Sequence, residues 1–245
     1  GYPSHAGGVY LASGQIYTMP LRAENGFLPV FGDIPPAVLN QARMMVLSYP
    51  HNPTSAVAPL SFFEEAVAFC QKHDLVLVHD FPYCDLVFSV SVPSILQADR
   101  DKTVSIEFFT MSKSYNMGGF RIGFAIGNAE LIRALRNVKA AIDFNQYRGI
   151  LNGAIAALTG PQDCVTATVE TYRRRRDTFV GALNRIGWSV PLPLATMYVW
   201  AKLPSPWEQD SIGFCLQMVE ATGIAASPGA GFGKAGEGYV RFALV

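Results

Sequence analysis

The sequence predicts an α/β protein with a mostly parallel sheet, helices on both faces, and a smaller α+β domain at the C-terminus. Apolar runs rich in β-branched and aromatic residues, at 44–49, 75–78 and 104–109, are typical of buried strands. A helical pattern separates the first two runs, which is the order of a right-handed crossover unit. Beyond Gly127 the apolar spacing becomes helical, and strand-like runs return only near the C-terminus.

Composition restricts the class of protein. The 245 residues are half apolar and 16% charged, which favours a large core over disorder. The formal net charge is zero, which argues against nucleic acid or an acidic membrane surface as the main partner. The four cysteines form no CxxC pair, and no segment is apolar for the length of a membrane span. We therefore expect a reduced, cytoplasmic protein.

The first fifty residues predict short strands at 9–12 and 16–19 and a longer one at 44–49. The third strand ends at the turn 50–53, where two prolines surround Asn52. Prolines deny the backbone regular structure and hold the asparagine in a fixed direction. A simple turn explains the same residues equally well, so both interpretations stay open for this segment.

Polar residues follow three of the predicted strands. A capping box at 61–64 predicts the start of a helix, and the strand at 75–78 comes after it. Asp80 follows that strand, as Asn52 and Lys113 follow the two others. Ligands of open α/β sheets bind at the carboxyl ends of strands, so we expect these side chains to share a site.

The segment 112–121 carries the strongest chemical signal. It joins the run at 104–109 to another at 122–126 through a turn at Gly118-Gly119, so Lys113 and Arg121 can face one site. A lysine at a buried strand end can lose its proton and capture a carbonyl carbon. An arginine beside it suits a phosphate. The pair indicates a pyridoxal phosphate (PLP) pocket, and the alternative is a surface loop with two solvated cations.

The rest of the chain predicts helices and a few strands. The expected helices cover 129–141, 151–158, 166–186 and 212–221, and the expected strands cover 197–202 and 239–244. We assign residues 1–160 to a large cofactor-binding domain and 161–245 to a small C-terminal domain. The arginine run at 173–176 is interpreted as a solvated helix face.

Other chemistry finds little support. Residues 231–236 match GxGxxG, but they precede a strand instead of following one, so we predict a loop. The four histidines have no metal-ligand spacing, and no metal is expected. Ser112 lacks the S-x-x-K spacing of a Ser-Lys hydrolase.

Together these motifs resemble the fold-type I PLP-dependent aminotransferases of classes I and II. The similarity is greatest to the branch that holds alanine (glutamate–pyruvate) and LL-diaminopimelate aminotransferases. Its strongest passage is 107–117, and 195–200 and 227–229 support it. The resemblance runs from Gly1 to Val245.

The resemblance implies roles for individual residues. Lys113 would bind the cofactor as a Schiff base and move the proton, Asp80 would pair with the ring nitrogen, and Tyr83 would assist them in catalysis. The remaining implied roles are hydrogen bonds from Asn52 and Tyr83 to the phenolic oxygen, stacking of Tyr2 on the ring, phosphate binding by Arg121, Thr110 and Ser112, and binding of the substrate α-carboxylate by Arg241 with Asn52. Thr110 departs from the family's usual serine or glycine but keeps a hydroxyl.

The activity implied is transfer of an amino group between an L-amino acid and a 2-oxo acid, in a homodimer with shared active sites. Glutamate–pyruvate exchange needs the fewest assumptions, because the chain offers no clear second cationic site: Arg22 lies in a loop of unknown placement. LL-diaminopimelate aminotransferase is the alternative within the branch. A C–S lyase of the same fold, or the effector domain of a transcription regulator built on it, would also fit these motifs.

The sequence starts without methionine and stops inside a strand-like run, so we expect both ends to be truncated. Members of the resembled family have a phosphate-binding helix start and a partner-subunit tyrosine before the position of Gly1. They also have a closing helix after the position of Val245. We expect full cofactor binding and activity to need those segments.

Overall fold

The computed structural model describes residues 3–245, and Tyr2, which was predicted to stack on a cofactor ring, lies outside the described residues. The chain forms two compact units. We call residues 31–50 and 58–170 the sheet unit, and residues 1–30, 51–57 and 171–245 the C-terminal unit. The division of the chain into domains at residue 160 stays a prediction. The boundary between the compact units lies ten residues later, after residue 170, and the segments 1–30 and 51–57 belong to the C-terminal unit.

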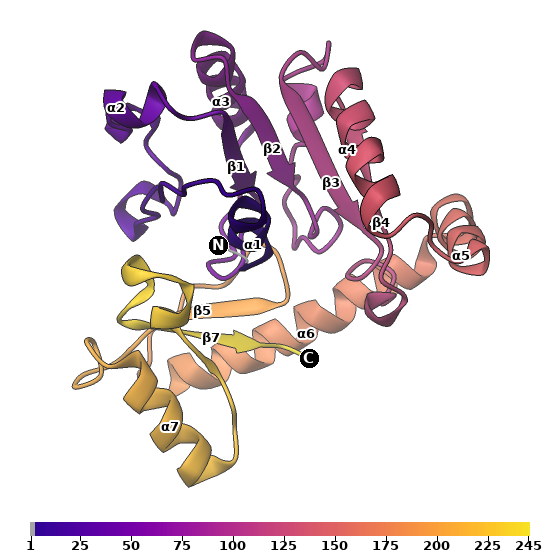
Figure 1. The fold of residues 1–245 in the computed structure, drawn as a ribbon. Coiled ribbons are helices and arrows are strands. Elements are labelled where there is room, and N and C mark those ends of the chain that lie inside the picture. The colour runs from indigo at the N-terminus through magenta and orange to yellow at the C-terminus, as the bar shows by residue number, and fades with distance from the viewer. Residues whose placement is uncertain (1–2) are drawn as a thin grey trace. The chain divides into compact units, whose positions relative to one another are not determined.

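The sheet unit contains a four-stranded, mostly parallel sheet of order β1-β2-β3-β4 (Figure 1). Its strands are β1 (Met44–Ser48), β2 (Val76–Asp80), β3 (Ser105–Thr110) and β4 (Gly123–Gly127). The first three are parallel, and β4 returns antiparallel to β3. The predicted mostly parallel sheet is therefore confirmed, and the carboxyl ends of β1, β2 and β3 lie at one edge.

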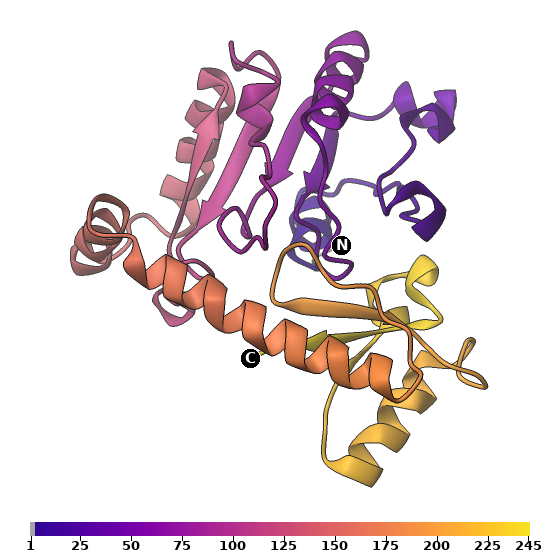
Figure 2. The same ribbon diagram turned by 180° about the vertical axis from the view of Figure 1, so that it is seen from behind.

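Four helices belong wholly to the sheet unit: α2 (Pro36–Leu39), α3 (Leu60–Lys72), α4 (Ala129–Ile142) and α5 (Arg148–Thr159). α4 lies in front of the sheet in Figure 1, and α3 lies in front of it in Figure 2, which is seen from behind. The two helices therefore cover opposite faces of the sheet. α3 buries a stripe of side chains with helical spacing, namely Phe62, Phe63, Ala66, Val67 and Cys70. This spacing places one face of α3 in the core.

The start of α3 differs from the prediction. The helix begins at Leu60, and its N-cap Pro59 makes no side-chain hydrogen bond, so the capping box expected at Ser61 is wrong. Extended backbone at Pro59 already sets the helix start, which places Ser61 inside the first turn. α4 starts in the ordinary way, because Asn128 accepts hydrogen bonds from the backbone of Glu130 and Leu131.

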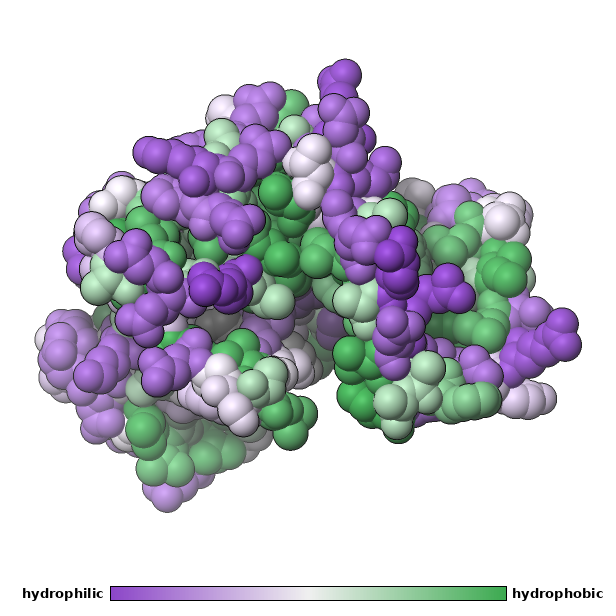
Figure 3. All heavy atoms as spheres, turned by 45° about the horizontal axis from the view of Figure 1, so that its top comes forward, coloured by the Kyte–Doolittle hydropathy of each residue, from purple (hydrophilic) through white to green (hydrophobic). Residues whose placement is uncertain are grey.

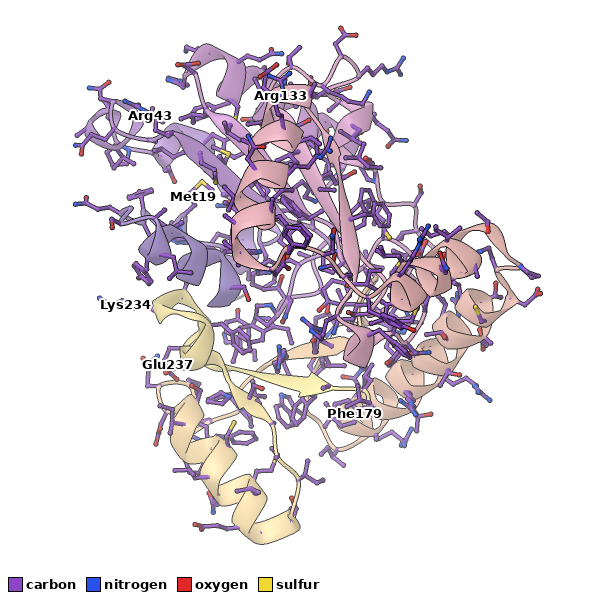
Figure 4. The ribbon with its side chains drawn as sticks, turned by 45° about the vertical axis from the view of Figure 1, so that its right-hand side comes forward. Met19, Arg43, Arg133, Phe179, Lys234 and Glu237 are labelled. Carbon is purple, nitrogen blue, oxygen red and sulfur yellow. The ribbon has the colours of Figure 1, made fainter. Side chains whose placement is uncertain are left out.

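The C-terminal unit contains a small antiparallel sheet of order β5-β7-β6. Its strands are β5 (Tyr198–Lys202), β6 (Ser227–Pro228) and β7 (Tyr239–Ala243), and its other elements are α1 (Pro3–Leu11), α7 (Ser211–Thr222) and the later part of α6 (Asp163–Arg185). Phe179 of α6 packs its ring 4.9 Å from that of Phe242 (Figure 4). Glu237 accepts hydrogen bonds from the backbone and hydroxyl of Ser211, which ties the start of α7 to the segment before β7.

Two strands expected near the N-terminus are wrong. Residues 9–11 lie in helix α1, and residues 16–19 have no regular structure. A strand needs a neighbouring strand for its backbone hydrogen bonds, whereas a helix satisfies them within itself. A short apolar run does not provide its own neighbouring strand. The β propensity of its residues is therefore not enough to make it a strand.

Short 3₁₀ segments make up much of the remaining chain. They are η1 (Ala23–Asn25), η2 (Phe31–Asp33), η3 (Ile95–Gln97), η4 (Gly118–Phe120), η5 (Gly229–Phe232) and η6 (Lys234–Gly236). The last two hold the GxGxxG sequence, and β7 follows them, so the prediction that residues 231–236 form a loop is confirmed.

Large apolar side chains reach the surface as well as the core, and Figure 3 shows them among hydrophilic residues on one face of the molecule. In the sheet unit the most exposed lie on α4, on α5 and between them: Val138, Ile142, Phe144, Tyr147 and Ile155. We call these five residues the apolar strip. Within residues 3–245, no helix combines the length and apolarity that a membrane crossing requires.

Candidate active site

Three predicted site residues meet at the carboxyl edge of the parallel strands. Asp80 is the last residue of β2, and its neighbours in the ladder are Ser48 of β1 and Phe108 of β3. Tyr83 is buried three residues later. The Nζ atom of Lys113, in the loop after β3, lies 6.0 Å from the centre of the Tyr83 ring. The sheet topology therefore brings the predicted lysine and tyrosine together next to the strand end that carries Asp80.

Lys113 is half-buried, and within residues 3–245 its amine makes no hydrogen bond or ion pair. The amine therefore has no carboxylate to displace before it meets the carbonyl group of a ligand. Burial also raises the pKa of the nearby Cys84 thiol to about 12, with the charge of Asp85 adding to the effect. The Cys84 thiol therefore stays protonated at neutral pH.

The predicted phosphate-binding residues lie on the β3–β4 turn. The Thr110 hydroxyl donates to the Ser112 hydroxyl over 2.9 Å and accepts from the Ser112 backbone. Thr110 pairs with Gly123 in the ladder, so Arg121 stands two residues from the partner of Thr110. The guanidinium of Arg121 is exposed and donates to the carbonyl of Gly118. Among the described residues it has no carboxylate partner, which leaves it free for an oxyanion.

Arg121 has an unusual backbone, with φ of 52° in the left-handed region. A non-glycine residue there costs about 1 kcal/mol or more, and such conformations gather at binding sites. The strain comes with the sharp turn from η4 into β4. It fixes where the guanidinium leaves the backbone.

Arg241 and Asn52 form a second cluster, within the C-terminal unit. Arg241 donates from Nη1 to Oδ1 of Asn52 over 2.8 Å and from Nη2 to Oγ of Ser227 over 3.1 Å. Its guanidinium carbon lies 4.3 Å from the centre of the Tyr198 ring and 4.8 Å from that of Phe232. The Nε atom is buried and has no hydrogen-bond partner within the described chain. Two hydrogen bonds and two aromatic rings thus hold the Arg241 guanidinium, and its Nε donor has no acceptor among the described residues.

Sequence reasoning missed Ser227, Tyr198 and Phe232 as neighbours of Arg241. The motif at 227–229 supports the family resemblance but assigns Ser227 no role. Ser227 stands directly opposite Arg241 in the β6/β7 ladder, a pairing between separate segments that the pattern of one segment does not reveal. Phe232 lies between two glycines whose backbones cross closely, since a Cβ on Gly229 would clash with the carbonyl oxygen of Gly236.

His51, beside Asn52, is neutral in the folded protein. Burial lowers its pKa to about 3, and the nearby charge of His5 adds to that effect. Its Nδ1 atom lies 2.8 Å from the hydroxyl of Thr54. A neutral, buried imidazole next to Asn52 helps to hold the turn.

Two other predictions concerned arginines. Arg22 pairs with Glu24 at 3.8 Å on an exposed turn, so its charge is already matched there. The expectation that the run at 173–176 is a wholly solvated face is wrong for Arg176, which is 5% exposed and donates to the carbonyl of Pro193. Arg176 also pairs with Asp177 at 2.7 Å. This buried arginine joins α6 to the segment before β5.

The residues of the sheet unit fit PLP. The cofactor carries an aldehyde, a basic ring nitrogen and a phosphate. An amine without an acidic partner, a strand-end carboxylate, and two hydroxyls with a guanidinium complement these three groups in turn. No group of three or more metal-ligating side chains occurs among residues 3–245.

Comparison with known proteins agrees with this chemistry. The family described as aminotransferase class I and II matches residues 1–244. An LL-diaminopimelate aminotransferase of Dehalococcoides mccartyi is 46% identical over 99% of this chain and 62% of its own length. The glutamate–pyruvate aminotransferase AlaC of Escherichia coli is 41% identical over 100% of this chain and 60% of its own length.

Solved structures are similar too. Substrate-bound BacF of Bacillus subtilis superposes with a TM-score of 0.96 at 37% identity, covering 100% of this chain and 62% of that one. A probable N-succinyldiaminopimelate aminotransferase of Thermus thermophilus gives 0.92 at 42% identity, with 100% and 65% covered. The chain thus spans less than two thirds of the length of these relatives. It belongs to the class I and II aminotransferases, the PLP-dependent family that the motifs around Lys113 indicated.

Proposed function

We propose that the protein is an aminotransferase that moves an amino group between an L-amino acid and a 2-oxo acid, with PLP as its cofactor. The observation that carries the proposal is Lys113, an amine without a described ion-pair partner on the turn between β3 and β4. Family membership over residues 1–244 supports the same reaction class. When bound, PLP supplies an electron-accepting ring to which the substrate nitrogen is joined.

Each residue around the cofactor would have a separate role. Lys113 would hold the cofactor covalently and then carry the proton to and from the substrate Cα. Asp80 would keep the ring nitrogen protonated. Tyr83 and Asn52 would hydrogen-bond the phenolic oxygen, and Tyr2 would stack on the ring. The phosphate would be bound by Arg121, Thr110 and Ser112, whose hydroxyls and guanidinium suit an oxyanion.

Arg241 would bind the α-carboxylate of the substrate. Its Nη1 and Nη2 atoms are oriented by Asn52 and Ser227, and its buried Nε lacks an acceptor within the described chain. A buried donor without a partner costs about 1–3 kcal/mol, and a carboxylate would recover that cost. Because the guanidinium is already oriented, little side-chain entropy remains to be lost on binding.

Glutamate–pyruvate exchange is the first candidate for the substrate pair. The side chains packed on Arg241 are the rings of Tyr198 and Phe232, and Arg22 already pairs with Glu24. Neither feature supplies a partner for a second charged group, which favours alanine as one amino acid of the pair. LL-diaminopimelate is the second candidate, and the 46% identity to an enzyme of that name favours it.

We also propose a homodimer with shared active sites in the cytoplasm. The apolar strip on α4 and α5 supports an association through the sheet unit, because monomers rarely leave so many large apolar side chains exposed. The four free cysteines are compatible with a reducing compartment. Sedimentation of the full-length protein, compared with an Ile142→Glu variant, tests the association.

A spectral experiment tests the reaction. The full-length protein loaded with PLP is mixed separately with L-alanine, L-glutamate, L-aspartate and LL-diaminopimelate, and the conversion of the cofactor to its amine form is followed by absorbance. We expect conversion by alanine and glutamate. Conversion by diaminopimelate with none by alanine would select the second candidate, and no conversion by any amino acid would contradict the proposed reaction.

A further inference from the structure

A buried pair of ionisable residues lies within the four-stranded sheet. His79 of β2 and Glu107 of β3 are both fully buried, and they stand directly opposite each other in the parallel ladder. Nδ1 of His79 lies 2.7 Å from Oε1 of Glu107. Nothing in the proposed reaction uses either side chain, so their presence in the core needs another explanation.

The carboxylate of Glu107 is well matched by donors. Oε1 accepts from His79 and from the backbone of Ile95 at 2.9 Å, and Oε2 accepts from the hydroxyl of Ser94. A buried carboxylate is tolerated only when it is hydrogen-bonded in this way. Ser94 and Ile95 stand at the start of η3, so Glu107 ties that segment to β3.

The imidazole of His79 reaches the other neighbouring strand. Its Nε2 atom lies 3.3 Å from the backbone nitrogen and 3.0 Å from the carbonyl oxygen of Tyr49, which follows β1. Nε2 therefore has a backbone partner whether or not it carries a proton. The ring centroids of Phe63 and Phe81 lie 4.8 and 5.0 Å from that of the imidazole. In these apolar surroundings, an imidazole nitrogen without a hydrogen bond would cost more free energy than in water.

The His79–Glu107 pair holds the backbone of β2 next to Asp80. Successive side chains of a strand point to opposite faces, so the His79 ring and the Asp80 carboxylate lie on different sides of the sheet. The side chain of His79 nevertheless fixes its own backbone to both β1 and β3, one residue before Asp80. The backbone that aims the Asp80 carboxylate is therefore held from both neighbouring strands.

Stability alone does not account for such a pair. Replacing a buried ion pair by apolar residues of similar volume is often neutral or stabilising. A polar pair fixes one geometry, because its hydrogen bonds form at one register only, whereas apolar contacts tolerate small shifts. A role in geometry is thus the better explanation.

We propose that His79 and Glu107 are positioning residues that hold the Asp80 carboxylate in line with the ring nitrogen of the bound cofactor. The proposal rests on the role proposed above for Asp80. Small misplacements of a reacting or orienting group cost up to about a hundredfold in rate, so the pair has a measurable function.

Two variants test this in the full-length protein: the isosteric Glu107→Gln, and His79→Gln, which removes the imidazole ring. A milder one at the edge of the core, Ser94→Ala, removes one donor to Glu107 together with the hydroxyl that accepts from the backbone of Leu96. The matched control is Asp99→Asn, because Asp99 is a buried carboxylate bonded to Thr103 and Ser105 at the opposite end of β3. The first readout is the ¹⁵N resonance of the ring nitrogen in labelled PLP, which reports its protonation.

We expect Glu107→Gln and His79→Gln to move this resonance toward the unprotonated nitrogen and to lower kcat about tenfold, with little change in the KM for the amino acid. Ser94→Ala should do the same to a smaller extent. Asp99→Asn should lower the unfolding midpoint and leave the resonance unchanged. In an Asp80→Asn background, the Glu107→Gln change should cause no further loss of kcat, because the residue through which it acts is already gone.

The same resonance shift in Asp99→Asn, or a full additional loss of kcat in the Asp80→Asn background, would overturn the positioning role. So would unchanged resonances in Ser94→Ala and Glu107→Gln together. Failure of the proposed function is recognised separately, because wild-type protein would then bind no PLP or convert none with any amino acid.

Discussion

Arg241 and Asn52, 189 residues apart in the sequence, are joined by a hydrogen bond of 2.8 Å from Nη1 to Oδ1. This bond, the one to Ser227 and the two packed rings leave the guanidinium little freedom. Its buried Nε has no partner within residues 3–245. The arginine is thus oriented before any ligand arrives, which is the property that a carboxylate-binding group needs.

Arg241→Lys should weaken amino-acid binding strongly. Lysine keeps the charge but lacks the planar fork, and loss of a shielded bidentate pair costs about 3 kcal/mol, or roughly a hundredfold in Kd. Stopped-flow titration with the amino acid measures this, while the absorbance of bound PLP should not change. Arg174→Lys, an exposed arginine of the same unit, is the control and should behave as wild type. Equal losses of cofactor and substrate binding would indicate a folding role instead.

Lys113→Arg should abolish covalent attachment of PLP. Borohydride reduction of the wild-type protein should fix the cofactor to the peptide that contains residue 113, and the variant should yield no labelled peptide. Transamination should fall by at least about a hundredfold, since a positioned proton-transfer group contributes roughly 10²–10⁴-fold. Lys102→Arg, on an exposed turn, should label normally. A label found at another lysine of the wild-type protein would refute the assignment.

Asp80→Asn should leave PLP bound but slow the reaction by orders of magnitude. Asparagine fills the same space at the end of β2 without stabilising a protonated ring nitrogen, which weakens the ring as an electron acceptor. Equilibrium dialysis measures cofactor binding, and single-turnover absorbance measures the half-reaction. Asp101→Asn, at an exposed position, serves as the comparison. Near-normal turnover in Asp80→Asn would count against its role.

His51 should make stability depend on pH. Burial lowers its pKa in the folded protein to about 3, whereas the unfolded chain binds a proton near pH 6.5. Unfolded His51 therefore holds more protons between these values, and stability falls as pH falls through that window. Between pH 7 and 5 the loss should be about 2 kcal/mol.

Urea unfolding at the two pH values measures this loss in wild type and His51→Gln. The variant should be less sensitive to pH by that amount, whereas His73→Gln, at the less buried end of α3, should keep the wild-type dependence. Identical pH dependence in all three proteins would show that His51 is not responsible.

Local sequence patterns were enough to predict several elements of the sheet unit. Continuous apolar runs marked β1, β2 and β3, and the Gly118-Gly119 pair marked the turn that carries Lys113 and Arg121. Strands buried in a parallel sheet and turns that need glycine leave such signals because the cause lies within a few residues. The candidate role of the lysine turn could be proposed for the same reason.

Local signals failed where another part of the chain decided the outcome. Residues 9–11 are helical despite their β propensity, because they pair with no strand of the described chain. Arg176 is buried although its run of four arginines indicates a solvated face, since the carbonyl of Pro193 and the carboxylate of Asp177 accept its hydrogen bonds.

The neighbours of the predicted residues depend on contacts between distant segments. Ser227 meets Arg241, and Glu107 meets His79, through strand registers that pair distant segments. A register is set by the whole sheet, and a shift of one residue would turn every side chain to the other face. The candidate site residues could therefore be proposed from the sequence, while the identity of their neighbours depended on which strands came to lie side by side.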